Sequence, residues 1–135
     1  MVLACGIMAN AEPLEPRHRA KLEEQLTGTV QVWRLLTERH GVKPGTALQL
    51  RVYYYGPGRE PLETLQRALD ARAAYTWEPA QPAAKVVSPE QAWVLVGLTE
   101  PLPLTSEFLL RWNAELFTAG VEHGCVFDGW EAKLR

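Results

Sequence analysis

Hydrophobic and polar residues alternate most regularly between residues 48 and 55. Four side chains fall on the apolar side of this stretch: Leu48, Leu50, Val52 and Tyr54. Strict alternation is typical of a β-strand with one buried face. Residues 92–98 are also apolar and β-prone but do not alternate, and this pattern predicts a strand covered on both faces.

Apolar side chains recur every three or four residues in three other stretches, which predicts three helices. The first helix is expected at 17–40, the second at 62–74 and the third at 106–120. Thr105 and Ser106 are good N-cap residues for the third helix. We expect side chains of the second and third helices to form one core: Leu65, Leu69, Phe108, Trp112 and Leu116.

Two shorter strands complete the predicted set of elements. One is expected at 75–78 or at 84–88, and the pattern leaves both positions open. The other is expected at 123–127, where the next two residues, Asp128 and Gly129, are typical of a tight turn. We expect this turn to fold Trp130 back against the sheet or the first helix, with Asp128 bonding backbone N–H groups and part of the tryptophan ring exposed.

The order of these elements predicts an α+β fold. A helix is followed by strand–helix–strand–strand–helix–strand, which is the ferredoxin-like split βαβ arrangement (βαββαβ, with a four-stranded antiparallel sheet) preceded by an extra N-terminal helix. In this arrangement the strands at 48–55 and 92–98 are adjacent and antiparallel at the sheet centre. We expect a flexible N-terminal segment at 1–15 and a single domain over 16–135.

Composition narrows the classes of protein. Hydrophobic residues make up 47% of the chain and charged residues 22%, which excludes disorder as its main character. The net charge of −2 argues against a general nucleic-acid binder. No apolar run approaches the length of about 20 residues that a membrane span needs.

The first residues and the two cysteines bear on the compartment. The residues that precede Cys5 resemble a lipoprotein signal but lack its charged and apolar regions, so we do not expect lipidation. Met1 and Met8 both remain candidate start residues. The two cysteines, Cys5 and Cys125, form no CxxC pair, and we expect reduced thiols in the cytoplasm.

Few residues suggest catalytic or metal chemistry. His123 and Cys125 lie two apart, so a strand would put both on one face, and a small enzyme with a Cys–His nucleophile is one alternative. No Asn or Asp that would orient the histidine is identifiable, and the histidines and cysteines lack zinc-ligand spacing. We therefore predict no catalytic, cofactor-binding or metal-binding residues.

Tyr53 and Tyr55 suggest a second alternative, an RNA-binding module. Aromatic side chains on the strands of ferredoxin-like domains stack on RNA bases. The expected partner strand at 92–98 carries no basic residue, however, and direct nucleic-acid binding is not expected.

Asp128-Gly129-Trp130, close after the expected last strand, resembles the signature of the ribonuclease E inhibitor B family, whose members regulate ribonuclease E activity. Further similarities run from about residue 20 to residue 132: Glu24-Gln25-Leu26 in the first helix, the Lys43-Pro44 turn, and the aromatic strand with Tyr53-Tyr54-Tyr55.

The resemblance implies a split βαβ fold and a small, cytoplasmic, non-catalytic protein that docks on a protein partner, with a ribonuclease as the candidate. Family members dock on ribonuclease E and reduce RNA turnover. Those studied as inhibitors are strongly acidic, whereas this chain carries −2 and its acidity is concentrated after residue 99. The partner-binding residues expected are Asp128, Gly129, Trp130, Tyr53 and Tyr55. The oligomeric state is left open.

Overall fold

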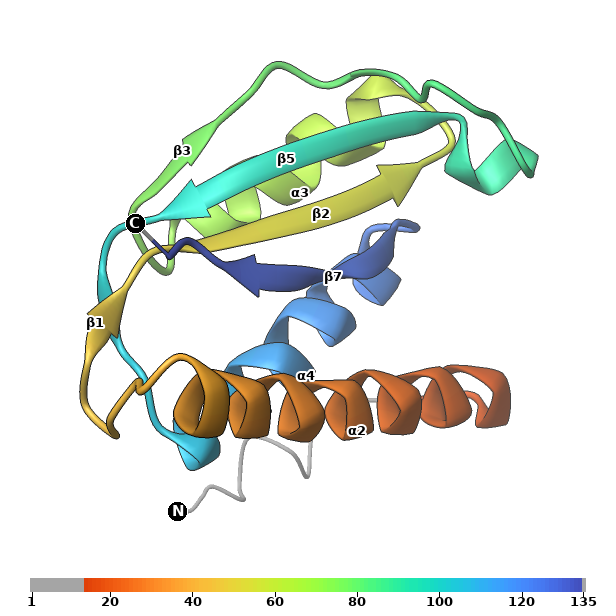
Figure 1. Cartoon of the computed structure of the whole chain (residues 1–135). Coiled ribbons are helices and arrows are strands. Elements are labelled where there is room, and N and C mark those ends of the chain that lie inside the picture. Colours follow the sequence, from red (N-terminus) through yellow and green to blue (C-terminus); the bar gives the residue numbers. More distant parts are fainter. Residues whose placement is uncertain (1–13, 135) are drawn as a thin grey trace.

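Strand β2 (Leu50–Gly56) lies inside the antiparallel sheet of the computed structural model, which describes residues 14–134 (Figure 1). It pairs with β5 (Trp93–Thr99) on one side and with β7 (Val126–Ala132) on the other. The predicted antiparallel pairing of 48–55 with 92–98 at the sheet centre is confirmed, because the strands run in the order β3-β5-β2-β7.

The far edge of β5 carries two short strands, β3 (Tyr75–Trp77) and β4 (Gln81–Pro82). The sheet therefore has five strands in the described residues rather than the predicted four. The additional strand arises because the chain pairs with β5 twice, first at β3 and then at β4. Of the two alternatives for the second strand, 75–78 is confirmed. Residues 84–88 form no strand; they lead to a short 3-10 helix, η1 (Pro89–Gln91).

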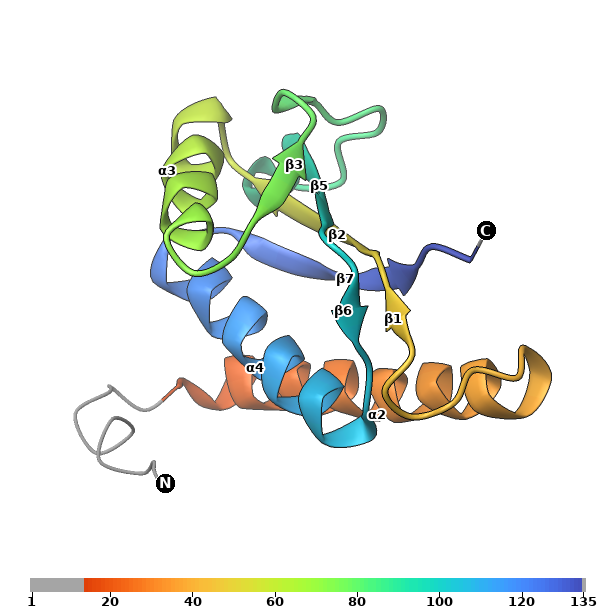
Figure 2. The same cartoon turned by 90° about the vertical axis from the view of Figure 1, so that its left-hand side faces the viewer.

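A small second sheet extends the ends of β2 and β5. It consists of β1 (Ala47–Leu48), which precedes β2, and β6 (Leu102–Pro103), which follows β5. The two strands pair antiparallel, and they connect α2 to β2 and β5 to α4 (Figure 2).

Two helices cover one face of the sheet and a third packs below them. The helices α3 (Arg59–Asp70) and α4 (Ser106–Glu122) lie on the same side of the sheet (Figure 2). The first helix, α2 (Pro16–Arg39), packs on α4 and passes beneath β7 (Figure 1). All three predicted helices and the α+β class are confirmed. Thr105 caps α4 as expected, because its hydroxyl accepts a bond of 3.0 Å from the Phe108 N–H.

The core lies between the sheet and these helices. Val52 and Tyr54 are fully buried on the helix side of β2, and the Tyr54 hydroxyl donates a bond of 2.6 Å to the Leu116 carbonyl in α4. The predicted cluster of Leu65, Leu69, Trp112 and Leu116 is confirmed, and Phe108 packs against its margin half-buried.

The prediction that 92–98 is covered on both faces is wrong. Only one side of β5 is buried, and Val94, Val96 and Leu98 are half-buried on the side away from α3 and α4. In the described chain no helix lies over that side (Figure 2). The expected flexible segment at 1–15 falls mostly outside the described residues, as do Met1, Cys5 and Met8.

Candidate functional site

Asp128 and Gly129 lie within strand β7 and not in a turn after a strand, so the predicted tight turn is wrong. The register between β2 and β7 shifts at this point, between Tyr53 and Tyr54, as it does at a β-bulge. Gly129 has a φ of 122°, a backbone conformation that other residues rarely adopt. The Asp-Gly pair therefore supplies the positive φ that a bulge needs, and the strand continues through it.

Asp128 does not perform the bonding role expected of it. Its residue is exposed, and none of the side-chain hydrogen bonds found within residues 14–134 involves its carboxylate. Partial burial raises the pKa of this carboxyl above its ordinary value through loss of hydration.

Trp130 joins β7 to two helices. Its indole N–H donates a bond of 3.0 Å to the hydroxyl of Thr29 in α2. Its ring meets the Trp112 ring of α4 edge to face, with 6.1 Å between ring centroids. Of the two predicted partners of Trp130, the sheet and the N-terminal helix, the bond to Thr29 selects the helix, and the ring stays partly exposed as expected, although a bulge rather than a turn directs it there.

Tyr53 and Tyr55 project from the opposite side of the sheet from Trp130. Both are half-buried and alternate along β2 with the fully buried residues of the helix side. The Tyr53 hydroxyl donates a bond of 2.6 Å to the Glu131 carboxylate, which also lies 3.6 Å from the Arg51 guanidinium. Burial, followed by the bond to Glu131, raises the pKa of Tyr53. The five predicted partner-binding residues therefore do not form one patch.

The two tyrosines belong to a larger surface, which we call the open sheet face. It comprises the side chains that β2 and β5 direct away from α3 and α4: Arg51, Tyr53, Tyr55, Val94, Val96 and Leu98. Register places them in three cross-strand pairs, Arg51 with Leu98, Tyr53 with Val96 and Tyr55 with Val94. The three β5 members could not be recognised from the sequence, because an unbroken apolar run does not reveal which face of a strand is uncovered.

His123 and Cys125 do not lie together on one face of a strand, as the Cys–His alternative required. His123 ends α4 rather than lying on a strand, and its Nδ1 is 2.9 Å from the Ala119 carbonyl oxygen. The expected strand at 123–127 begins only at Val126, because the chain turns through Gly124 with a φ of 70°. Cys125 is buried, and its thiol is 3.5 Å from the backbone oxygen of His123, not from the imidazole.

Burial raises the pKa of the Cys125 thiol to about 11. With this pKa the thiol is almost entirely protonated at neutral pH. Because the thiolate is the nucleophilic form of cysteine, the group has little nucleophilic reactivity at that pH. We expect Cys125, measured in a Cys5→Ser background, to react with iodoacetamide at least about tenfold more slowly than a free cysteine at neutral pH. The rate should rise with pH beyond the range in which ordinary thiols ionise. Reaction as fast as that of free cysteine would show an activated thiol and contradict this assignment.

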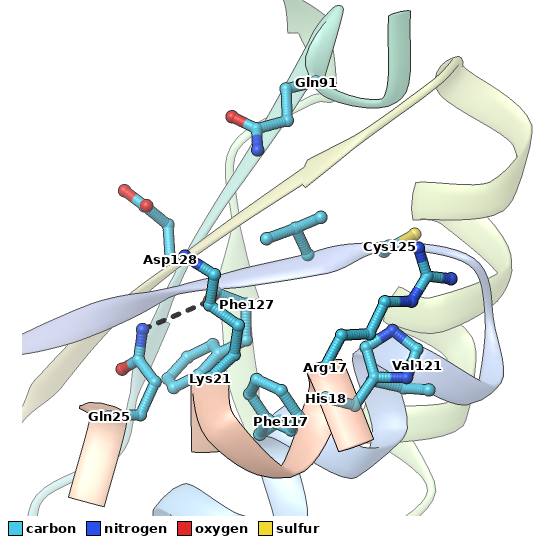
Figure 3. Close-up of a pocket in the computed structure, with 11 residues that line it drawn as sticks. Arg17, His18, Lys21, Gln25, Gln91, Phe117, Val121, Cys125, Phe127 and Asp128 are labelled. Carbon is cyan, nitrogen blue, oxygen red and sulfur yellow. Dashed lines mark hydrogen bonds between the residues drawn. The ribbon is translucent and has the colours of Figure 1, made fainter. Parts of the chain in front are cut away.

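A cleft runs between α2 and β7 (Figure 3), and we call it the α2–β7 cleft. Its volume is about 360 Å³. The first turns of α2 contribute Arg17, His18 and Lys21 to one wall, and these side chains extend toward β7 (Figure 3). The remaining lining residues are Gln25, Gln91, Phe117, Val121, Cys125, Val126, Phe127 and Asp128.

Metal-ligand clusters, membrane-spanning helices and similarity to known proteins bear on the function of the chain. Within residues 14–134, no three His, Cys, Asp or Glu side chains gather as ligands for a metal ion. No helix in the same range combines the length and the apolar character that crossing a membrane requires. Comparisons of the chain with protein-family models and with curated proteins found no match.

Proposed function

We propose that this chain is a small, non-catalytic regulator that acts by binding a protein partner on its open sheet face. The observation that carries the proposal is the composition of that face: two tyrosines beside three aliphatic side chains, without a covering helix in the described chain. Tyrosine is enriched at protein interfaces because it combines apolar area with a polar tip. Val94, Val96 and Leu98 are half-buried, so part of their apolar surface reaches solvent beside the tyrosines. Apolar patches with a polar border are typical of interaction surfaces.

The arrangement of the strands supports a ferredoxin-like split βαβ fold. The order β7-β2-β5-β3, with α3 following β2 and α4 following β5, is the order in which the four strands of that unit lie. The resemblance to the ribonuclease E inhibitor B family implies the same fold, and on this basis we propose a ribonuclease as the partner and the cytoplasm as the compartment. In this proposal the bulge at Asp128 and Gly129 directs Trp130 to α2, and Trp130 holds β7 and α2 together on the side of the sheet opposite the interface.

A protein partner fits the open sheet face better than RNA does. Of the side chains that β2 and β5 direct to this face, Arg51 is the cation, and it lies 3.6 Å from Glu131, whose carboxylate also accepts the Tyr53 hydroxyl bond. Lys85, from the loop after β4, lines a hollow with Tyr55 and Val94 at the other end of the face. A phosphate would have to displace that carboxylate or lie beside it, and the like charges would repel. Nucleic-acid binding by such sheets normally depends on uncompensated cations next to the aromatic rings.

Replacing Val96 by glutamate tests the proposal, because this residue lies at the centre of the open sheet face opposite Tyr53. We expect Val96→Glu to weaken binding to purified ribonuclease E by at least about tenfold in calorimetry, as loss of a central interface contact does. The matched control is Val30→Glu, which changes a 42% exposed valine on α2 and should leave binding unchanged.

Two results would contradict the proposal. One is equal binding by the wild-type, Val96→Glu and Val30→Glu proteins. The other is an absence of ribonuclease binding together with steeply salt-dependent binding of single-stranded RNA, which would favour the RNA-binding alternative. Thermal unfolding of each variant shows whether the fold is retained.

A further inference from the structure

The α2–β7 cleft has one wall rich in positive charge. Arg17, His18 and Lys21 lie on successive turns at the start of α2, and Figure 3 shows them extending toward β7. The facing wall contributes a single acid, Asp128. The Arg17 and Lys21 side chains are 78% and 72% exposed, and their pairs with Glu15 and Glu24 are solvated. Exposed pairs of this kind contribute little, so both cations remain available to a ligand.

The floor of the cleft is apolar. Phe117 and Phe127 are buried beneath it, and Val121 and Val126 line its sides. The surface thus combines cations along one wall with aliphatic and aromatic carbon below, which suits a ligand that carries both carboxylates and apolar side chains.

The strand that forms the second wall has an unpaired edge. β7 is the last strand in the sheet order, so within the described chain only β2 pairs with it. The cleft reaches this edge at residues 126–128, whereas α2 lies against the strand further along, where Trp130 bonds Thr29. On the outer edge, the Phe127 carbonyl accepts a hydrogen bond of 3.4 Å from the Gln25 side-chain amide. A bond this long is weak, and a peptide N–H replaces it at little cost. An extended peptide that adds to a sheet edge gains its affinity from such backbone bonds.

We propose that the α2–β7 cleft binds an extended acidic segment of a partner protein, which pairs with the outer edge of β7 and places its carboxylates against Arg17 and Lys21. This site goes beyond the proposed function, because it uses a different surface from the open sheet face. RNA suits the cleft less well, because the aromatic rings below it are buried and offer no stacking surface.

The test measures binding of a fluorescent peptide of alternating glutamate and valine, about eight residues long to match a typical strand. Fluorescence anisotropy compares the full-length wild-type chain with the double variant Arg17→Gln/Lys21→Gln. We expect about a tenfold loss of affinity in the variant, because two charge-assisted contacts are removed. The matched control is Arg34→Gln/Arg39→Gln, which removes the same charge from the other end of α2 and should leave affinity unchanged.

A second measurement locates the peptide. Amide chemical shifts of the ¹⁵N-labelled protein should change at 126–128 and not at 94–98, which belong to the open sheet face. Changes confined to 94–98 would overturn the cleft proposal and leave the proposed function standing. Failure of ribonuclease binding at the open sheet face would not affect the peptide result.

Three other outcomes would also overturn the proposal. The first is an equal loss of affinity in both double variants, which would show a general effect of net charge. The second is equal binding of a peptide in which lysine replaces glutamate. The third is binding of single-stranded oligouridylate in the cleft without binding of the acidic peptide.

Discussion

Trp112→Ala is expected to lower the free energy of unfolding by about 3–5 kcal/mol, as large-to-small changes in a packed core do. Trp112 is only 7% exposed and connects two parts of the fold. Its ring stacks on Phe108, with 6.2 Å between centroids, and meets Trp130 edge to face. Removing the ring leaves a cavity under the sheet and takes away the partner against which β7 places Trp130.

Urea denaturation followed by fluorescence measures this loss. A domain of this size has a total stability of about 5–15 kcal/mol, so the variant should unfold at a much lower urea concentration. Trp112→Phe is the milder substitution, because it keeps an aromatic ring and should lower the free energy of unfolding by less. Val30→Ala changes an exposed side chain on α2 and serves as the surface control. A loss below about 1 kcal/mol in Trp112→Ala would mean that the ring contributes little to the core.

Alanine substitutions at two glycines are expected to have opposite effects. A Cβ at Gly97 would lie 2.4 Å from Cζ3 of the Trp77 ring, which cannot yield easily because its N–H donates a bond of 2.7 Å to Asp70. Gly97→Ala should therefore destabilise the protein by about 1–3 kcal/mol, as overpacking does. A Cβ at Gly28, in the middle of α2, meets nothing within 4 Å. Gly28→Ala should stabilise by about 0.5–1 kcal/mol through helix propensity.

Calorimetric melting of both variants beside the wild type tests the pair. The two proteins carry the same added methyl group, so a difference in sign isolates the local surroundings from the chemistry of the substitution. A Gly97→Ala variant that melts at the same temperature as the wild type would show that the Trp77 ring moves aside without cost. A destabilised Gly28→Ala variant would show that α2 needs a glycine at this position for a reason other than space.

Local pattern was sufficient where polar residues mark the exposed surface of an element. The alternation of Val52 and Tyr54 with polar neighbours identified β2 and its buried side, because a strand directs successive side chains to opposite faces. The spacing of Leu65, Leu69 and Trp112 identified the helices and the core between them. The central pairing of β2 with β5 also followed from the order of elements, because few sheet topologies fit that order.

Local pattern failed where the result depends on what lies beside an element. The apolar run in β5 looks the same whether one face or both are covered, so its half-buried side, with Val94 and Val96, was not foreseen. An Asp-Gly pair is compatible with either a tight turn or a β-bulge. At Asp128-Gly129 the bulge forms because β7 continues to pair with β2 on both sides of the register shift between Tyr53 and Tyr54. His123 was predicted on a strand, but α4 extends to Glu122, so His123 lies at the end of the helix.

The candidate surfaces show the same division. Side-chain periodicity placed Tyr53 and Tyr55 on one face of a strand, and the burial expected of a large apolar ring placed Trp130 against either the sheet or the first helix without deciding between them. Only the tertiary structure decided that these residues lie on opposite sides of the sheet, because the bulge at Gly129 sets the register that follows it. It also decided that Arg17 and Lys21 face β7 across a cleft, because no local pattern relates side chains about a hundred residues apart in the chain.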